Sequence, residues 1–205
     1  MKEQKDPSDS ELLQAMLAGD EAALATLYRR RQGSVYRFAL QMSGSTALAE
    51  DVTQDVFMAL MRSGHSYDSD RGPLAWFLLG MARNVLRQRL GRERFYTSLA
   101  DDAGESGGAS KLVSVSDPLS ELSRNETIEG VRKAVLSLPT RYREVVVLCE
   151  LQELSYAEAA GVLGCAIGTV RSRLHRARSL LIDKLRPAIQ EDEAAGDVKA
   201  ARCFA

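Results

Sequence analysis

Apolar side chains recur at intervals of three and four residues along most of this chain, the spacing that places them on one face of an α-helix. The pattern extends over residues 11–90 and returns over residues 127–185. Alternation of apolar and polar positions, which marks a half-buried strand, is nearly absent. The sequence therefore predicts an all-α protein with two helical regions.

A polar segment, residues 97–126, separates the two regions and is rich in Ser, Gly and Asp but poor in large apolar side chains. Such a segment cannot bury enough apolar surface to offset the entropy lost on ordering. We therefore expect a flexible acidic linker between two small helical domains, residues 11–96 and 127–187. The last segment, residues 188–205, follows a proline and is expected to be a mostly disordered tail.

Positive charge is concentrated in two segments of a nearly neutral chain. The 205 residues include 27 Lys and Arg against 28 Asp and Glu, so any contact with a polyanion must come from local patches. Residues 71–96 hold six arginines and one acid, and residues 155–186 hold six lysines and arginines and two acids. We expect two separate contacts with a polyanion, one for each domain.

Residues 155–178 carry the signals of two helices joined by a tight turn. Ser155 and Glu158 have the spacing of a capping box, in which each side chain bonds the other residue's backbone N–H. Gly164 can take the left-handed conformation that ends a helix, and the second helix is expected to begin near Ile167. These signals predict a helix-turn-helix.

The second of these helices has an apolar side and a polar side when its residues are placed about 100° apart. The apolar side consists of Val170, Leu174, Ala177 and Leu181. The opposite side consists of Arg171, Ser172, His175, Arg176 and Ser179. A helix fits the major groove of DNA, where arginine reads guanine and serine or histidine can bond base edges. The sequence favours contact with duplex DNA over an ordinary solvated cationic face.

Several further side chains lie beside this helix or begin the helix before it. They are Arg141, Tyr142, Arg143, Arg173 and Arg178. We interpret them as candidates for contact with DNA phosphates. For Arg141, Tyr142 and Arg143, simple exposure to solvent is the alternative.

Residues 48–60 present two stripes at helical spacing. The inward stripe is expected to be Leu48, Val52, Val56 and Leu60. The second stripe is Asp51, Gln54, Asp55 and Met58. It fits a protein partner whose arginines surround an apolar contact, and a solvated acidic face is the alternative. Phe57 is expected in the core with one edge shared with this stripe. No histidine lies near the two aspartates, so a protein contact is favoured over a metal site.

The arginine-rich helix expected from Leu74 to about Arg92 also has two sides. Its buried side is expected to be Leu74, Leu78, Met81 and Val85. Another side carries Trp76, Gly80, Arg83 and Arg87, with Asn84 beside them. An aromatic ring beside arginines can hold unstacked bases, at about 1–3 kcal/mol for each stacked base. A plain core position is the alternative for Trp76.

Together these segments resemble the bacterial RNA polymerase sigma factors of the extracytoplasmic-function (ECF) group. Residues 138–178 resemble region 4 of that family, residues 47–63 resemble its region 2.2, and residues 67–95 resemble its regions 2.3 and 2.4. The resemblance spans about residues 11–94 and 127–186, in the family's order and at its spacing.

The resemblance implies a protein that binds core RNA polymerase, through the clamp helices of the β′ subunit and the flap of the β subunit. It would direct the polymerase to a promoter and help to open the DNA. Region 4 would bind the −35 element as duplex, and region 2 would capture the −10 element as a single strand. An anti-sigma factor would hold the protein inactive in the bacterial cytoplasm or at the inner membrane. The chain would not itself insert into a membrane, and no metal or other cofactor is implied.

The residue patterns and the resemblance give three sets of site residues. The −35 set is Arg141, Tyr142, Arg143, Tyr156, Thr169, Arg171, Ser172, Arg173, His175, Arg176 and Arg178. The −10 set is Tyr67, Asp70, Arg71, Trp76, Arg83, Asn84 and Arg87. The polymerase set is Asp51, Gln54, Asp55, Phe57 and Met58. The loop before the arginine-rich helix would pocket a flipped base, whose extrusion costs a few kcal/mol. Ala166 departs from the capping residue that family members often carry there, at a cost of about 1 kcal/mol.

Two other classes of function stay open on the residues alone. One is an autonomous repressor or activator with a helical sensory domain, which the acidic stripe and the arginine-rich helix disfavour. The other is an adaptor that binds only proteins, which the outward cations at Arg171, His175 and Arg176 disfavour. An enzyme is disfavoured because the chain has two histidines, no metal-like grouping and no phosphate-binding glycine loop. Three widely spaced cysteines fit a reducing cytoplasm.

Overall fold

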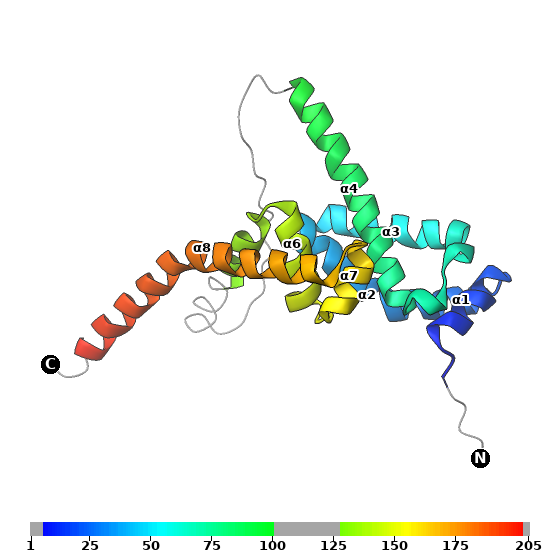
Figure 1. The fold of residues 1–205 in the computed structure, drawn as a ribbon, viewed down its shortest axis with the longest axis horizontal. Helices are drawn as coiled ribbons and strands as arrows, with labels where there is room; N and C mark the ends of the chain where they lie inside the picture. The colour runs from blue at the N-terminus through cyan, green and yellow to red at the C-terminus, as the bar shows by residue number, and fades with distance from the viewer. Residues whose placement is uncertain (1–5, 101–127, 203–205) are drawn as a thin grey trace, which may run out of the picture.

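The computed structural model describes the backbone of residues 6–100 and 128–202, and the side chains of residues 6–91 and 128–186. Within these residues the regular elements are helices and no strand occurs, so the predicted all-α class is confirmed (Figure 1). We call residues 6–100 the N-terminal lobe and residues 128–202 the C-terminal lobe.

The first three helices of the N-terminal lobe have starts that are capped by polar side chains. The elements of this lobe are α1 (Asp9–Leu17), α2 (Glu21–Ser43), α3 (Thr46–Ser63), η1 (Gly64–Ser66), η2 (Ser69–Arg71) and α4 (Leu74–Ala100). Ser8 and Glu11 form a capping box before α1, and Asp20 caps α2. Gly44 ends α2 with a φ of +73°, a left-handed conformation that glycine adopts at low cost.

The apolar stripes of these helices meet in a common core. Its fully buried side chains include Leu13, Leu27, Val35, Phe38, Val52, Leu60, Leu74, Leu78 and Leu86. The predicted inward stripe of α3 is buried at Val52, Val56 and Leu60, while Leu48 is half-buried at the edge. The opposite stripe of α3 is therefore left facing outward.

The C-terminal lobe contains the predicted helix-turn-helix. Its elements are a helical segment over residues 128–136, α6 (Thr140–Val146), the π-helical turn η3 (Val147–Leu151), α7 (Tyr156–Leu163) and α8 (Ile167–Arg202). Ser155 and Glu158 form the expected capping box, Gly164 has a φ of +64°, and α8 starts at Ile167. The apolar side of α8 is buried at Val170, Leu174 and Ala177 and half-buried at Leu181. The helix-turn-helix prediction is therefore confirmed.

Two helices run further than the sequence predicted. The backbone of α4 stays helical to Ala100, so it takes in the first residues of the expected linker, and residues 101–126 lie outside the described residues. The backbone of α8 stays helical to Arg202, past Pro187, where a disordered tail was expected. Residues 188–202 include five alanines and two glutamates, which are strong helix formers, and this composition outweighs the single break at the proline.

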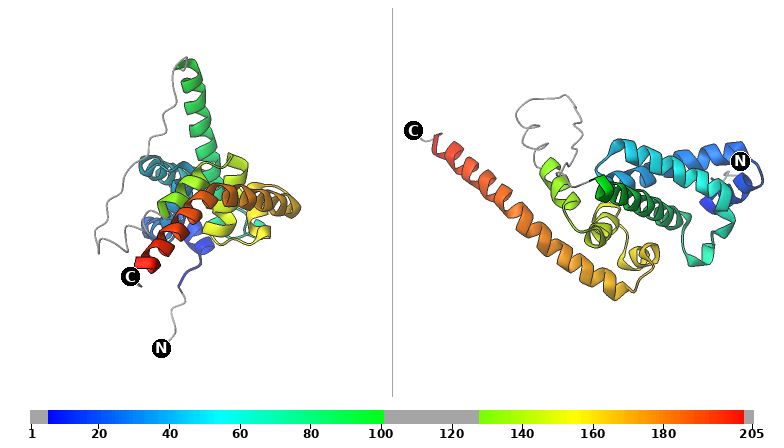
Figure 2. Two further views of the ribbon diagram at one scale, coloured as in Figure 1. Left: turned by 90° about the vertical axis from the view of Figure 1, so that its left-hand side faces the viewer. Right: turned by 90° about the horizontal axis from the view of Figure 1, so that it is seen from above.

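The two lobes pack against each other. Buried side chains of both lobes form one continuous hydrophobic cluster, with α4 against α7 and α2 against η3. The far ends of α4 and α8 project away from the packed helices (Figures 1 and 2). In the described parts of both lobes, no helix is long and apolar enough to cross a bilayer.

Candidate nucleic-acid and protein interfaces

Local hydrogen bonds cap the start of α7, the first helix of the helix-turn-helix. The backbone N–H of Ser155 donates to Glu158 Oε2 at 2.6 Å, and the N–H of Glu158 donates to Ser155 Oγ at 3.3 Å. Hydrogen bonds from Ser155, its hydroxyl first and its backbone second, lower the pKa of the Glu158 carboxyl. The glycine turn then lets α8 leave at a fixed angle, with its apolar side buried against α6 and α7.

The outward side of α8 carries most of the predicted base-reading set. Its exposed members are Arg171, Ser172, His175 and Arg176, while Thr169 and Arg173 are half-buried at its edges. The exposed ring of Tyr156 lies at the start of α7, and the Arg171 guanidinium stands 6.0 Å from its centroid. This cation–π contact joins two predicted DNA residues in one surface. The structure thus brings these side chains together on one accessible face.

Arg178, at the flank of that face, is paired within the lobe. Its Nη2 and Nε donate to Glu150 Oε1 on η3, at 2.5 and 3.2 Å, and this pairing raises the pKa of the guanidinium. Both side chains are largely exposed, so the pair is weak and open to competition from a phosphate.

The residues at the start of α6 divide between surface and interior. Arg141 is exposed, with its guanidinium 4.7 Å from the ring centroid of Tyr142. Arg143 instead turns inward, and its Nη1 donates to the carbonyl of Met42 on α2 at 2.6 Å. Its Nη2 donates to the carbonyls of Leu138, at 3.1 Å, and Leu136. Arg143 must leave these carbonyls before it can reach a phosphate.

The acidic stripe of α3 faces outward as predicted, and one arginine of the chain already sits on it. Arg89 of α4 donates from Nη1 to Asp51 Oδ2 at 2.8 Å, and from Nε and Nη2 to Asp55 Oδ2 at 3.0 and 2.5 Å. These hydrogen bonds, to Asp55 first, raise the pKa of the Arg89 guanidinium. Met58 is 47% exposed and Gln54 is exposed beside them. The stripe thus has the geometry to bind a guanidinium next to an apolar side chain.

Phe57 does not lie on that stripe. Its side chain is only 4% exposed, and its ring meets Tyr28 edge-on with 4.8 Å between the centroids. Met58, the next residue, points to solvent because neighbouring positions on a helix lie about 100° apart. The structure places Phe57 in the core, where a polymerase contact would reach little of it.

The predicted −10 residues on α4 and its preceding loop divide into exposed and half-buried side chains. Asn84, Arg87, Asp70 and Arg71 are exposed, and Trp76 is half-buried against the core. The Tyr67 hydroxyl donates to the carbonyl of Gly72 at 3.0 Å and so fixes the loop. Gly72 has a φ of +132°, and a Cβ there would collide with the Trp76 ring.

Arg83, the central cation of that set, is bound to the other lobe. Its Nε donates to Glu144 Oε1 at 2.7 Å and its Nη2 to Glu144 Oε2 at 3.2 Å. Gln152 also donates to Gln41 across the lobes at 2.8 Å. Sequence reasoning missed Glu144, although a carboxylate followed by four apolar residues signals a buried, paired position.

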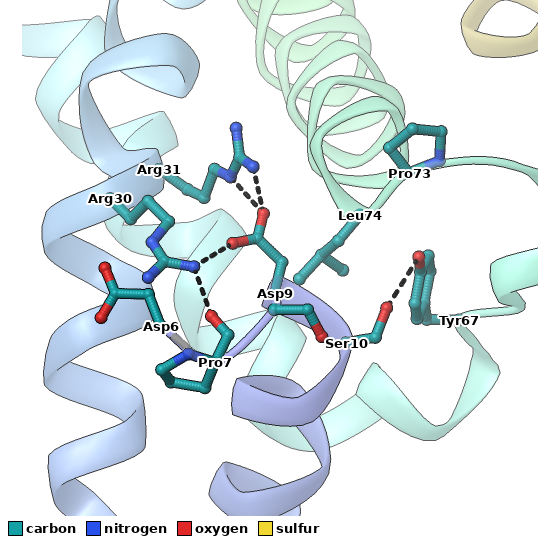
Figure 3. Close-up of a pocket in the computed structure, with 10 residues that line it drawn as sticks. Asp6, Pro7, Asp9, Ser10, Arg30, Arg31, Tyr67, Pro73 and Leu74 are labelled. Atoms are coloured by element: carbon teal, nitrogen blue, oxygen red, sulfur yellow. Dashed lines mark hydrogen bonds and ion pairs between the residues drawn. The ribbon is translucent and has the colours of Figure 1, made fainter. Parts of the chain in front are cut away.

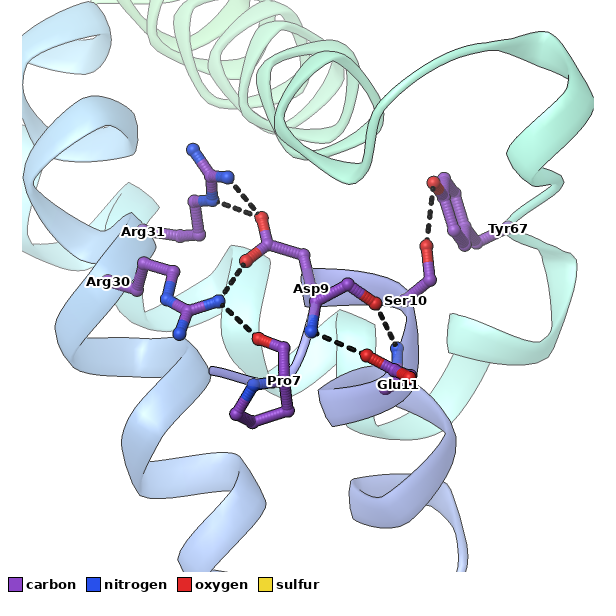
Figure 4. Close-up of polar contacts among 8 residues, drawn as sticks. Pro7, Asp9, Ser10, Glu11, Arg30, Arg31 and Tyr67 are labelled. Carbon is purple, nitrogen blue, oxygen red and sulfur yellow. Dashed lines mark hydrogen bonds and ion pairs between the residues drawn. The ribbon is translucent and has the colours of Figure 1, made fainter. Parts of the chain in front are cut away.

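A cavity of about 520 Å³ opens beside the loop that precedes α4, between the starts of α1 and α4 and the middle of α2. Figure 3 shows Asp9 there between two guanidinium groups, with a 3.0 Å ion pair to Arg30 and another to Arg31. Arg30 also donates to the carbonyl of Pro7 at 2.9 Å (Figure 4). The sequence prediction did not include this cluster, although the three consecutive arginines on α2 were a visible signal.

Comparison with known proteins agrees with the geometry of both lobes. Residues 27–96 match the family model of sigma-70 region 2, and residues 128–181 match that of sigma-70 region 4. The chain is 35% identical over 189 residues to the ECF RNA polymerase sigma factor SigE of Mycolicibacterium smegmatis, covering 88% of this chain and 70% of that protein. It is 33% identical over 175 residues to SigM of Mycobacterium tuberculosis, covering 85% of this chain and 83% of that protein.

Solved structures show the same fold. The sigma factor RpoE of Bartonella quintana, crystallised with the anti-sigma factor NepR, is similar with a TM-score of 0.65 and 25% identity. That match covers 79% of this chain and 96% of the other. CnrH in complex with the cytosolic domain of CnrY is similar in fold, with a TM-score of 0.64 over 88% of this chain and 99% of the other.

Proposed function

Because this chain belongs to the extracytoplasmic-function family of RNA polymerase sigma factors, we propose how its two lobes share the recognition of a promoter. The C-terminal lobe reads the −35 element as duplex, the −10 residues of the N-terminal lobe capture unpaired bases, and the α3 stripe binds the polymerase. Catalysis belongs to the polymerase and needs no cofactor in this chain.

The exposed side of α8 is the observation that carries the proposal. A capped, glycine-terminated α7 orients α8, whose apolar side is buried and whose opposite side presents Arg171, His175 and Arg176 to solvent. Such a helix can enter the major groove N-terminus first, with arginine against guanine. Arg141 and Arg178 lie where phosphates border the groove, and Arg178 exchanges Glu150 for a phosphate.

Replacement of Arg176 by alanine tests the −35 assignment. The variant Arg176→Ala should lose about 1–3 kcal/mol of binding to the preferred promoter and relax its preference at one base pair. The matched control is Arg186→Ala, which removes an exposed cation from the same helix nearly three turns further on. Run-off transcription by the holoenzyme on a promoter library measures both. An equal loss on every promoter would assign Arg176 to a phosphate instead.

The unpaired −10 strand is proposed to bind beside α4. The exposed Asn84 and Arg87 offer a polar and a cationic contact, and the part of the Trp76 ring that is not packed on the core is available to a base that stacks on it. Opening of the promoter duplex then needs no ATP, because capture of a transiently unpaired strand shifts the DNA population toward the open form. Trp76→Ala should slow promoter opening, measured by permanganate reactivity of unpaired thymines, more than it weakens the first duplex complex. Equal losses in both steps would remove Trp76 from the strand contact.

The outward stripe of α3 is proposed to dock on the clamp helices of the β′ subunit. Arg89 on Asp51 and Asp55 supports this, because it occupies the carboxylates as a partner's arginine would. Asp55→Arg should weaken holoenzyme assembly strongly, while the lost Arg89 pair costs the fold at most about 1 kcal/mol because it is exposed. The control Glu129→Arg makes the same charge reversal on the C-terminal lobe. Unchanged assembly of Asp55→Arg would place the dock elsewhere.

An anti-sigma partner is proposed from the relatives. RpoE of Bartonella quintana was crystallised with an anti-sigma factor, and this chain matches it over most of its length. We infer that a comparable inhibitor binds this protein in the cytoplasm, where bacterial RNA polymerase works. Co-purification of the tagged chain from its native cells tests the assignment, with core polymerase and one small inhibitor as the expected partners.

A further inference from the structure

The loop that joins α3 to α4, residues 64–73, has an inward and an outward side. We call it the capture loop, because it carries residues of the proposed −10 set. Gly64 is buried and Tyr67 and Gly72 are half-buried, whereas the remaining residues, among them Asp70 and Arg71, are exposed. The inward residues therefore hold the capture loop on the lobe, and the outward residues stay accessible to DNA.

Helix α1 touches the capture loop at two places. Gly64 packs so closely on α1 that a Cβ there would stand 3.1 Å from Leu13 Cδ1. Further along, the Tyr67 hydroxyl donates to the carbonyl of Gly72 at 3.0 Å and lies 3.5 Å from Ser10 Oγ. Since the single hydroxyl proton of Tyr67 goes to Gly72, the Ser10 hydroxyl is the donor in this long hydrogen bond. Tyr67 thus ties the end of the capture loop to α1.

The first turn of α1 is fixed to α2 by two arginines. Asp9 lies between the guanidinium groups of Arg30 and Arg31, with an ion pair of 3.0 Å to Arg30 and another to Arg31 (Figures 3 and 4). The Asp9 side chain is 11% exposed, against 31% and 33% for the two arginines, so the carboxylate is the enclosed partner. Ser10 follows Asp9 directly, so the position of its hydroxyl beside Tyr67 depends on these ion pairs.

The capture loop in turn packs on one of the proposed base contacts. Gly72 lies against the Trp76 ring, and a Cβ at Gly72 would stand 2.3 Å from the ring carbon Cε3. The Tyr67 ring also meets Phe77 of α4, with 5.6 Å between the centroids. Because Tyr67 holds the carbonyl of Gly72, it sets where the capture loop lies relative to the Trp76 ring.

We propose that Tyr67 is a positioning residue for strand capture, and that Ser10 and Asp9 of α1 hold it in place. The inference rests on the proposed function, since the capture loop and Trp76 are taken as contacts of the unpaired −10 strand. The Tyr67 hydroxyl is directed at the protein and acts on the bases through the loop that it holds. A loop that is already ordered binds an unpaired base more tightly, because no ordering entropy is lost at that moment.

Fluorescence of Trp76, the single tryptophan of the chain, reports on the capture loop without DNA or polymerase. Tyr67→Phe keeps the ring and removes the hydroxyl, and acrylamide should quench Trp76 about twofold more strongly in this variant because the loop opens locally. Ser10→Ala should act in the same direction, and it does not endanger α1 because alanine is the strongest helix former. The control Tyr36→Phe removes the hydroxyl of a half-buried tyrosine on α2 and should leave the quenching unchanged. Equal quenching in Tyr67→Phe and Tyr36→Phe would overturn the proposal.

Promoter opening by the holoenzyme tests the effect on strand capture. On promoters that the parent holoenzyme selects from a library, Tyr67→Phe should slow the appearance of permanganate-reactive thymines about fivefold, as expected for one lost hydrogen bond. The affinity of the first duplex complex should stay unchanged, and base preference should relax at the −10 element but not at the −35 element. A loss of folded protein would instead lower both steps by one factor at every promoter, and that result would refute the positioning role.

Two further comparisons test whether these residues act together. The double variant Ser10→Ala/Tyr67→Phe should open promoters no more slowly than Tyr67→Phe alone, because both changes remove the same contact. Asp9→Asn should also slow opening, whereas Glu21→Gln, which removes one negative charge from the exposed start of α2, should not. Additive losses in the double variant, or equal rates for Asp9→Asn and Glu21→Gln, would contradict the proposal.

The outcomes separate the positioning role from the proposed function. If Tyr67→Phe raises the quenching of Trp76 but opens promoters at the rate of the parent, the positioning role fails and the proposed function stands. If the parent chain and active core polymerase together open no promoter, the proposed function fails and the positioning role fails with it.

Discussion

Truncation of Phe57 to alanine should destabilise the protein severely, whereas truncation of its neighbour Met58 should not. Phe57 is 4% exposed and its ring packs edge-on against Tyr28 at 4.8 Å, so Phe57→Ala removes a full aromatic side chain from the N-terminal core. Loss of such a side chain costs about 3–5 kcal/mol, of which the aromatic pair supplies about 0.5–1.5 kcal/mol. Met58 is 47% exposed, so Met58→Ala should change the free energy of unfolding by at most about 0.5 kcal/mol.

Urea unfolding followed by far-UV circular dichroism gives the free energy of unfolding of each variant, provided that the dependence of this free energy on urea concentration is the same as in the parent protein. Assembly of the holoenzyme from core polymerase and each variant tests the proposed docking role. Met58→Ala should weaken polymerase binding with the fold intact, and Phe57→Ala should weaken it only as far as folded protein is lost. A loss of stability below about 1 kcal/mol for Phe57→Ala would refute the division of α3 into a core face and a docking face.

Three further changes test local features. Gly72→Ala should lower the melting temperature, at a cost of about 1–3 kcal/mol from the positive φ and the clash with Trp76, and an unchanged melting temperature would contradict this. Because the pKa of Glu158 is lowered in the folded protein, its ionised carboxylate stabilises the fold at pH values above the usual glutamate pKa of about 4.3. This stabilisation is lost as the pH falls through the lower pKa of the folded state. The stability advantage over Glu158→Gln should therefore shrink on acidification, and a constant difference would argue against the cap. Burial first, and the charge of Glu150 second, raise the pKa of the Cys149 thiol, so less of it is the reactive thiolate at neutral pH. In a variant without the other two cysteines, Cys149 should therefore react with Ellman's reagent more slowly in the folded protein than in the unfolded chain.

Features that depend on neighbours in sequence could be predicted. The box of Ser155 and Glu158 and the turn at Gly164 are set by residues a few positions apart, and they appear where the pattern placed them. The exposed side of α8 followed from the same periodicity. Family resemblance supplied the division into −35, −10 and polymerase surfaces, which spacing alone does not give.

Features that depend on distant partners could not be predicted. Arg83 and Glu144 are 61 residues apart in the sequence, and Arg89 and Asp55 are 34 residues apart. Because no local pattern links such distant residues, the sequence indicated each arginine only as a cation that could contact DNA. The packing of the lobes decides which arginines are occupied within the chain. The helical backbone past Pro187 has a local origin, because several helix-forming residues follow that one proline.

Transcription by purified core polymerase, with and without the full-length chain and mapped by start site across a promoter library, tests the central claim most directly. The account predicts starts at a restricted set of promoters only when the chain is present, with a shared upstream duplex element and a shared element that opens. Identical start sites in its absence would contradict it.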